Sequence, residues 1–387
     1  YEYYLKGIRG TSFYEVDAFG REVGLAKGLD SQNPEPGNNI VTTIDIDIQY
    51  ILEEIMMGKK GVIIVGNPST GEIIGAVSAP DFEPDLFTGL MLEKDWEKVL
   101  RDPDKPLINR MIQGLYPPGS IVKMVTATNL LLNPEFDPNK YQRCDGHYQF
   151  GDRLFGCWQS QGHGDMTLNT AILNSCDVYF YKNVHLINLN ELSSTFRSYG
   201  FGQATLLDIP GESVGIVPTS EYMTKRYGRY GWSKGAILNI CIGQGELLVT
   251  PIQVFNYINL LATNGNAGTP HFVMVDKIPK NIAPKLDSKF WNRIKSDMKD
   301  VINHENGTGR SANPNVDGMI VFGKTGTAEN PHGENHAWFI GWAELDDSKY
   351  SIVVLLENSG SGGTVAAPVA RKVFAQISKN TQLSFYE

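Results

Sequence analysis

Apolar and polar positions follow two different periods along the chain, and the helical period comes first. From Asp47 to Met57, apolar residues recur on one face at intervals of three to four, which predicts an amphipathic helix. Two apolar runs of strand length follow, at 61–65 and 72–77, and the turn-forming residues 67–71 separate them. This spacing predicts a hairpin of two antiparallel strands.

The middle of the chain, 82–305, follows mainly the helical pattern, and strand patterns return near the end. Apolar runs at 319–322, 337–343 and 351–356 predict three strands, and 367–378 predicts a last helix. Strands at both ends of a helical middle predict an α/β domain. We expect a central antiparallel sheet completed by distant segments, with flanking helices and an inserted helical subdomain.

The first 38 residues are short strand-like pieces interrupted by glycines and closed by a turn-forming run at 34–37. They are too few to build a core of their own. We therefore expect a small segment, 1–38, and one domain, 39–387. The chain begins with Tyr1 rather than Met, so we expect it to be a piece of a longer protein.

Composition narrows the class of protein. The 387 residues are 41% hydrophobic and 20% charged and include four cysteines, which is typical of an ordinary globular protein. The net charge is −9, and no basic stripe follows the sequence, which argues against nucleic acid as a partner. No apolar run approaches the roughly 18 residues that a membrane-spanning helix needs.

A serine and a lysine stand three positions apart where the chain is broken by two prolines and Gly119. Ser120 opens an apolar helix that we expect to run to about Leu132. On a helix this spacing puts Ser120 and Lys123 on one face, about 5–6 Å apart, so the amine could take the proton of the hydroxyl. Apolar neighbours would exclude water from the amine.

A simpler interpretation of this pair is a helix cap followed by a surface lysine. The same spacing recurs at Ser296 and Lys299, in a polar, charge-rich helix, and we interpret that second copy as chance. Context distinguishes the two copies.

Two more motifs follow in order. A helix-like stretch meets Ser175-Cys176-Asp177, and Lys324-Thr325-Gly326-Thr327 comes after an apolar strand, where we expect Lys324 to be a solvated cation.

The residues 318–325 also match the phosphate-binding loop G-x-x-x-x-G-K-[ST]. Their bulky apolar positions suit a strand, and Gly326 and Pro331 follow where that motif needs a helix, so we do not expect a nucleotide hydrolase. No Gly-x-Ser-x-Gly elbow supports a triad with one of the seven histidines.

Together, the three motifs form the signature of the penicillin-recognising acyltransferases. The chain resembles the penicillin-binding transpeptidases, and most closely the penicillin-binding protein 2 family, class B enzymes of rod-type wall elongation. The resemblance covers nearly the whole chain and includes the segments 15–21, 243–245, 250–253 and 336–339. Asp177 stands where many relatives have asparagine, and aspartate there is typical of the elongation branch.

The resemblance implies a role for each motif residue. Ser120 would attack the D-Ala-D-Ala carbonyl of a peptidoglycan stem peptide with Lys123 as base, and an amine of a neighbouring strand would resolve the acyl-enzyme. Ser175, Asp177 and Lys324 would relay the proton to the leaving group and hold the charge balance.

The resemblance also implies how the lysine motif binds substrate. Thr325 and Thr327 would hydrogen-bond the substrate carboxylate, and Gly326 would let the strand come close to the substrate. The backbone N–H groups of Ser120 and Thr327 would form the oxyanion hole.

The function implied is a peptidoglycan D,D-transpeptidase of cell elongation that β-lactam antibiotics inhibit. A serine β-lactamase or D,D-carboxypeptidase shares the motifs, and a non-catalytic β-lactam sensor or scaffold could keep them, but the length and the N-terminal piece favour the transpeptidase. The resemblance further implies that 1–38 is the remnant of a pedestal domain. It also implies one inner-membrane anchor upstream, a periplasmic or extracytoplasmic catalytic domain, and a partner glycan polymerase of the elongation complex that binds through the missing N-terminal region. No organic cofactor is implied.

Three of the four cysteines lie near a histidine, in the order Cys144, Cys157, His163 and Cys176 and with the spacing C-x12-C-x5-H-x12-C. Three sulfurs and one imidazole suit tetrahedral zinc with no open position, which indicates a structural site. A Cys144–Cys157 disulfide and buried free thiols are the alternatives. Some members of the penicillin-binding protein 2 family carry zinc beside the second motif, which favours zinc here.

Overall fold

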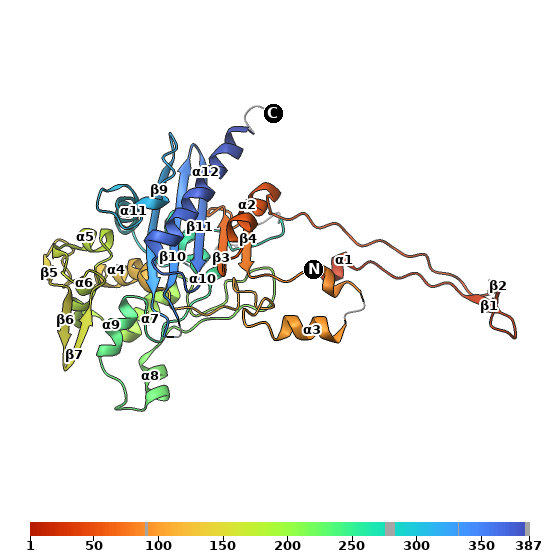
Figure 1. Ribbon diagram of the computed structural model, residues 1–387, viewed down its shortest axis with the longest axis horizontal. Coiled ribbons are helices and arrows are strands. Elements are labelled where there is room, and N and C mark those ends of the chain that lie inside the picture. The colour runs from red at the N-terminus through yellow and green to blue at the C-terminus, as the bar shows by residue number, and fades with distance from the viewer. Residues whose placement is uncertain (90–91, 275–282, 332, 384–387) are drawn as a thin grey trace. The chain divides into compact units, whose positions relative to one another are not determined.

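A five-stranded antiparallel sheet lies at the centre of the larger part of the molecule (Figure 1). In spatial order its strands are β4 (Ile73–Ala79), β3 (Gly61–Gly66), β11 (Ser348–Leu356), β10 (His336–Leu345) and β9 (Ile320–Ala328). Every neighbouring pair is antiparallel. The sheet therefore joins the two ends of the sequence, which confirms the predicted α/β fold with a sheet completed by distant segments.

The computed structural model describes residues 1–89, 92–274, 283–331 and 333–383. These residues form two compact units. One contains Tyr1–Thr43 with Val273 and Met274, and the other contains the rest of the described chain from Ile44 onward.

Helices cover the sheet. α2 (Ile46–Met56) packs against β4, and α12 (Ala367–Leu383) and α10 (Pro251–Ala262) both pack against β10 and β11. In Figure 1, α12 crosses in front of the sheet and α10 lies behind it. α10 begins with a capping box between Thr250 and Gln253, which satisfies two backbone N–H groups at the helix start. Because helices cover the sheet, its central strands are buried, as the apolar runs predict.

The segment between β4 and β9 is mainly helical, as predicted. Its longer helices are α3 (Glu93–Leu100), α4 (Lys123–Leu131), α5 (Leu168–Leu173), α6 (Asp177–Lys182), α7 (Leu189–Ser198), α8 (Ser220–Tyr227), α9 (Gly235–Cys241) and α11 (Ser288–Asn303). The same segment contains four short 3₁₀ turns: η1 (Pro84–Phe87), η2 (Gly119–Val122), η3 (Val184–Leu186) and η4 (Arg310–Ala312). A short π-helical turn, η5 (Gly362–Ala366), lies between β11 and α12.

Two small hairpin-like sheets interrupt the helices. β5 (Gln142–Cys144) pairs with β8 (Gly164–Met166), and β6 (His147–Phe150) pairs with β7 (Arg153–Gly156). Sequence analysis did not predict them because strands of three or four residues are too short to show an alternating pattern.

The smaller unit contains α1 (Glu2–Leu5) and an antiparallel pair, β1 (Tyr14–Val16) and β2 (Glu22–Leu25). All residues of both strands are exposed, and the buried hydrophobic core begins only at Ile48. The unit extends to Thr43, beyond residue 38, because the backbone of Thr42 bridges to Val273.

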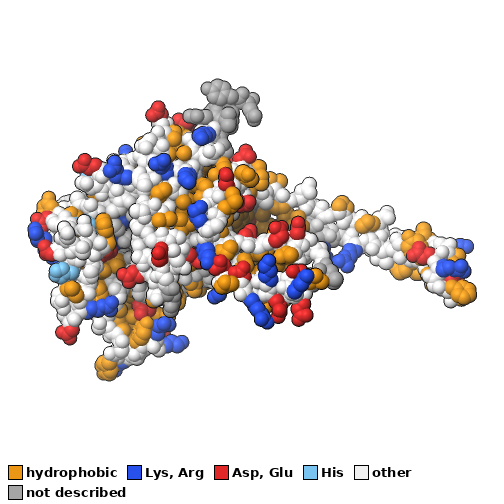
Figure 2. Space-filling model, in the orientation of Figure 1, with side chains coloured by type: hydrophobic (Ala, Val, Ile, Leu, Met, Phe, Trp, Pro, Cys, Tyr) orange, Lys and Arg blue, Asp and Glu red, His pale blue; other side chains and the backbone are white. Residues whose placement is uncertain are grey.

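On the face shown in Figure 2, acidic and basic side chains are intermingled. Among the described residues, every helix is too short or too polar to cross a lipid bilayer.

Candidate active site

Ser120 lies in η2, the tight turn that leads into α4. The sequence predicts an α-helix that starts at Ser120, and the structure differs in that the first turn is a 3₁₀ turn and α4 begins at Lys123. Gly119 adopts a left-handed φ of 57°, and a Cβ there would lie 2.7 Å from the carbonyl oxygen of Thr327. Only glycine fits this close approach between the turn and strand β9.

The amine of Lys123 is fully buried and contacts the second motif. Its Nζ donates to the Ser175 carbonyl oxygen at 2.7 Å, to Asp177 Oδ1 at 2.7 Å and to Ser175 Oγ at 3.3 Å. These three acceptors match the three N–H groups of an ammonium. The backbone N–H of Lys123 donates to the carbonyl oxygen of Ser120 in the same turn, whereas the Lys123 amine bonds to Ser175 and Asp177.

Ser175 lies in a strained turn between α5 and α6. Its φ is +53°, a left-handed conformation that non-glycine residues seldom adopt. The backbone N–H groups of Ser175 and Cys176 donate to Ile172 and Ala171 in α5, and these bonds hold the turn. Held in this way, Ser175 places its hydroxyl between two lysine amines.

The second of these amines belongs to Lys324 in β9. Its Nζ lies 2.9 Å from Ser175 Oγ, and the side chain is fully buried. Burial holds the pKa of Lys324 well below its usual value of 10.5, and the nearby charge of Lys123 lowers it further. The prediction that Lys324 is a solvated cation is therefore wrong. β9 is covered by β10, α11 and η2, and such packing cannot be read from the local sequence.

The residues after Lys324 line the approach between β9 and the nucleophile turn. A Cβ on Gly326 would lie 2.8 Å from Ile121 and 3.0 Å from the Pro118 carbonyl oxygen, so the missing side chain lets strand and turn pack closely. Thr325 Oγ1 donates to Thr308 Oγ1 at 3.3 Å, and Thr327 Oγ1 accepts from the N–H of Gly362 at 3.2 Å.

The second serine–lysine copy and the phosphate-loop match are not part of this cluster. Ser296 and Lys299 are exposed on α11. From Ile320 onward, the phosphate-loop match is strand β9, as predicted, so its N–H groups do not form a phosphate-binding loop.

Sequence analysis missed a buried ion pair beside the nucleophile turn. Arg110 Nε donates to Glu357 Oε1 at 2.9 Å, and the hydroxyl of Tyr116 donates to the same oxygen at 2.6 Å. Arg110 and Glu357 are 247 positions apart, so no local pattern relates them. The only available signal was the position of Tyr116, directly before the prolines that precede Ser120.

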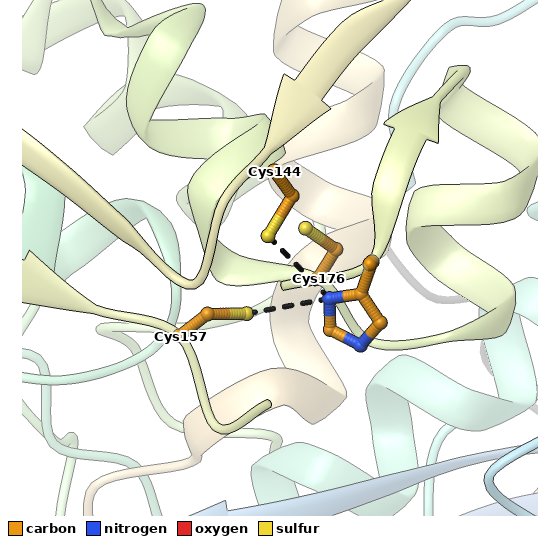
Figure 3. Close-up of side chains that lie close together, drawn as sticks. Cys144, Cys157 and Cys176 are labelled. Atoms are coloured by element: carbon orange, nitrogen blue, oxygen red, sulfur yellow. Dashed lines mark hydrogen bonds between the residues drawn. The ribbon is translucent and has the colours of Figure 1, made fainter. Parts of the chain in front are cut away.

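The predicted metal ligands converge behind the second motif (Figure 3). His163 Nδ1 lies 3.6 Å from Cys144 Sγ and 3.5 Å from Cys157 Sγ, and the ligand atoms of the four residues, including Cys176, lie within 4.8 Å of one another. In tetrahedral zinc sites the metal–ligand bonds of about 2.0–2.3 Å imply ligand separations of roughly 3.6–3.8 Å. The donor set fits zinc.

The chemistry of the same four residues agrees with this fit. All cysteines of the described chain are free thiols, so Cys144 and Cys157 form no disulfide here. The hydrogen bond from Cys176 lowers the pKa of the Cys157 thiol and raises the pKa of Cys176. Cys176 is also the residue between Ser175 and Asp177, so the cluster lies directly behind two groups of the candidate active site.

Comparisons with known proteins agree with this arrangement of motifs. Residues 61–375 match the family model described as the penicillin binding protein transpeptidase domain. A Haemophilus influenzae protein named peptidoglycan D,D-transpeptidase MrdA is 33% identical, over 96% of this chain and 61% of its own length. The Acinetobacter baumannii protein of the same name is 30% identical, over 97% of this chain and 58% of its own length. The chain thus spans about three fifths of the curated relatives it matches.

Solved structures show the same fold. Pseudomonas aeruginosa PBP2, in complex with WCK 5153, superposes with a TM-score of 0.80 at 33% identity, covering 89% of this chain and 76% of that one. Helicobacter pylori PBP2, in complex with MreC, gives 0.82 at 32% identity, covering 93% and 68%. The chain therefore belongs to the penicillin-binding protein transpeptidase family, with homologues among the MrdA, or PBP2, proteins.

Proposed function

We propose that this chain is a serine D,D-transpeptidase that cross-links peptidoglycan stem peptides during cell elongation. The observation that carries the proposal is that the amines of Lys123 and Lys324 both reach the hydroxyl of Ser175, beside the turn that holds Ser120. Lys123 is also paired with Asp177. Ser120 Oγ forms an ester with the penultimate D-Ala of the donor stem peptide, and the peptide C–N bond breaks to release the terminal D-Ala. An amine of a neighbouring strand then attacks the ester and restores the hydroxyl.

The two lysines supply the proton transfers. Lys123 must lose a proton before it can accept one from Ser120. Ser175 Oγ is within hydrogen-bond reach of both amines, and the lowered pKa of Lys324 favours an uncharged amine that accepts a proton. A proton can therefore pass from Lys123 through Ser175 to Lys324, which leaves Lys123 free to take the proton of Ser120. Ser175 then gives a proton to the leaving D-Ala amine and takes one back from Lys324.

Backbone and hydroxyl groups around the turn complete the site. The N–H groups of Ser120 and Thr327 stabilise the oxyanion of the tetrahedral intermediate. The hydroxyls of Thr325 and Thr327 exchange their present protein partners for the terminal carboxylate of the donor peptide. The close packing of Gly326 against Pro118 and Ile121 supports this arrangement because it keeps β9 beside the nucleophile.

Intact-protein mass spectrometry after incubation with a penicillin tests the proposal. The strained amide of the antibiotic mimics the terminal dipeptide, and ring opening adds the whole antibiotic to Ser120 without loss of mass. We expect one adduct, absent in Ser120→Ala and retained in the matched control Ser296→Ala. An adduct on the peptide that contains Ser296, or none at all, would contradict the proposal.

The fate of the acyl-enzyme separates the alternative activities. A β-lactamase would clear the adduct within seconds and turn over a chromogenic cephalosporin, whereas a transpeptidase keeps it. The contact of Asp177 with Lys123 supports the transpeptidase, because that carboxylate is engaged with a cation and not free to activate water. Exchange of terminal D-Ala for a labelled D-amino acid then distinguishes an acyltransferase from a carboxypeptidase and from a non-catalytic sensor.

Two structural neighbours support a partner. One structural neighbour is a PBP2 bound to MreC, and another is described as a peptidoglycan synthase complex that coordinates polymerization and crosslinking. For the whole protein, we propose an inner-membrane anchor upstream of Tyr1, a periplasmic catalytic domain, and a glycan polymerase of the elongation complex as partner. Co-purification of the full-length protein with such a polymerase, lost when the upstream region is deleted, tests this.

We also propose that Cys144, Cys157, His163 and Cys176 hold one structural zinc ion. These residues would hold the ion and would tie the turn around Cys176 to β5 and to the loop after β7, and the ion would play a structural role without contact to substrate. Elemental analysis of protein purified without chelator should find about one zinc per chain. Cys157→Ser should lose the metal, and Cys241→Ser, which changes a buried free cysteine outside the cluster, should keep it.

A further inference from the structure

The segment just before Ser120 is held by one phenol and one carboxylate. The Tyr116 hydroxyl donates to Glu357 Oε1 at 2.6 Å, and Arg110 Nε donates to the same oxygen at 2.9 Å. Arg110 and Glu357 are nearly buried, with side-chain exposures of 7% and 16%. The three side chains therefore form a largely buried network, and its Tyr116 is four residues before the nucleophile Ser120.

Arg110 is itself fixed on several sides. Its guanidinium also donates to the carbonyl oxygens of Asp104 and Lys105, and its backbone N–H donates to Ser78 Oγ at 2.9 Å. Glu357 follows the end of β11, and its N–H donates to the carbonyl oxygen of Lys60. The carboxylate that receives the Tyr116 hydroxyl is thus anchored to the central sheet.

The ring and the backbone of Tyr116 connect this network to the turn that carries the nucleophile. The ring makes edge-to-face contacts with the rings of His336 and Trp338, at 5.5 Å and 6.2 Å between centroids. Trp338 Nε1 donates to the carbonyl oxygen of Pro117 at 3.1 Å. The backbone of Tyr116 exchanges two hydrogen bonds with Val249. The chain on the N-terminal side of Ser120 is therefore held through both the side chain and the backbone of Tyr116.

The protonation states favour a stable hydrogen bond between Tyr116 and Glu357. Burial raises the pKa of the Tyr116 phenol, and the charge of Glu357 raises it further, so the hydroxyl stays a donor. Burial also lowers the pKa of His336, whose Nδ1 accepts from the N–H of Asn358. An uncharged ring at His336 matches the edge contact with Tyr116.

We propose that Tyr116, held by Glu357 and Arg110, is a positioning residue that sets the attack geometry of Ser120. This inference rests on the proposed acyl transfer at Ser120. Tyr116 touches neither the reacting hydroxyl nor the lysines, so its effect acts through the turn at 117–119. Small displacements of a reacting group cost large factors in rate, because the attack requires a narrow range of distance and angle.

Stopped-flow acylation with a fluorescent penicillin separates a positioning role from a purely structural one. Tyr116→Phe keeps the ring and removes the bond to Glu357. We expect the acylation rate constant to fall roughly ten- to a hundredfold, with unchanged non-covalent binding and a full burst amplitude. A purely structural role predicts a smaller amplitude, from a smaller folded fraction, with a normal rate constant.

The partner residue supplies the rescue and the coupling test. Glu357→Gln keeps an acceptor oxygen for Tyr116 and should retain much of the rate. Glu357→Ala also removes the carboxylate that pairs with Arg110, so it should be at least as slow as Tyr116→Phe. Because both Tyr116→Phe and Glu357→Ala remove the bond between Tyr116 and Glu357, the double variant should be no slower than the slower single variant. If the rate losses of the two single variants add up in the double variant, the proposed role of the Tyr116–Glu357 bond is wrong.

Tyr199→Phe is the matched control, since Tyr199 is a buried phenol that bonds to Thr128 Oγ1 at 2.9 Å on the helix after Lys123. It should acylate at the wild-type rate. A normal rate constant in Tyr116→Phe, or an equal loss in Tyr199→Phe, would overturn the inference while wild-type acylation still supports the proposed function. Absence of acylation in the wild type would instead refute the proposed function.

Discussion

The amine of Lys324 lies 2.9 Å from the hydroxyl of Ser175, although 149 positions separate the two residues. The amine of Lys123 lies 3.3 Å from the same hydroxyl. A hydroxyl between two amines can donate its proton to one while it accepts a proton from the other. In the proposed mechanism, Ser175 is therefore the group through which a proton passes between the two lysines.

Lys324→Met should abolish most of the acylation without unfolding the protein. General acid–base catalysis contributes roughly 10²–10⁴-fold in rate, and the substitution removes the buried amine that we propose as a proton acceptor. It also removes the cost of keeping that amine out of water, so the free energy of unfolding should stay equal or rise. Acylation kinetics and urea unfolding measure the two effects.

Lys295→Met is the control for this prediction. Lys295 lies on α11 beside β9 and pairs with Glu344, so the change removes a lysine of the same neighbourhood without touching Ser175. Its acylation should be normal. A large loss of stability in Lys324→Met together with normal acylation would show that Lys324 is structural.

The stability of the protein should rise with pH in the alkaline range because of Lys324. Its pKa is well below 10.5 in the folded state and returns to about that value on unfolding. Between the two values the unfolded chain binds more protons, so the free energy of unfolding increases as the pH approaches 10.5. Below the folded-state pKa this contribution becomes constant. Urea unfolding from pH about 7 to about 9.5 should show a steeper rise in the wild type than in Lys324→Met, and equal slopes would contradict the assignment.

Asp177→Asn should weaken both the fold and the reaction. The change removes the charge that balances Lys123 but leaves an oxygen that can accept its hydrogen bond, so we expect a loss of about 1–3 kcal/mol in the free energy of unfolding. Asp177→Ala, which leaves the buried cation unpaired, should cost about 3–5 kcal/mol. Thermal or urea unfolding provides the measurement. Glu97→Gln, in an exposed pair with Arg101, should cost less than about 1 kcal/mol. A similar small loss for all three would show that the buried pair is energetically neutral.

Removal of the proposed zinc should lower melting temperature and acylation rate together. The turn that carries Ser175 and Asp177 contains Cys176, so loss of the metal frees both groups from one side. A strong chelator followed by calorimetry and penicillin acylation tests this, and added zinc should restore both values. If the chelated protein melts and acylates as before, the cluster has no such role.

Gly326→Ala should slow acylation by pushing β9 away from the nucleophile turn. The new Cβ would lie 2.8 Å from Ile121, which is fully buried, and 3.0 Å from the backbone carbonyl oxygen of Pro118. Overpacking of this kind costs about 1–3 kcal/mol. Gly24→Ala places a Cβ with no atom within 4 Å and should change neither stability nor acylation. Normal acylation by Gly326→Ala would show that this spacing is not critical.

The local patterns of the sequence predicted much of this molecule. The apolar periods predicted α2, the hairpin of β3 and β4 and the strand β9, because those patterns depend on residues a few positions apart. The order and spacing of three short motifs indicated the family. The spacing of three cysteines and one histidine indicated which residues meet behind the second motif, and the structure brings those four together.

Burial and long-range partners were decided only by the tertiary structure. Lys324 follows an apolar run and reads locally as a cation at the end of a strand, but β10, α11 and η2 enclose it and lower its pKa. Lys123 lies three positions from Ser120, yet its amine bonds to Asp177, and Tyr116 bonds to a carboxylate 241 positions away. Such contacts depend on how distant elements pack. Sequence therefore determined which chemical groups this protein carries and in which local structures, and the packing of the sheet against the helical subdomain determined which groups touch and which carry charge.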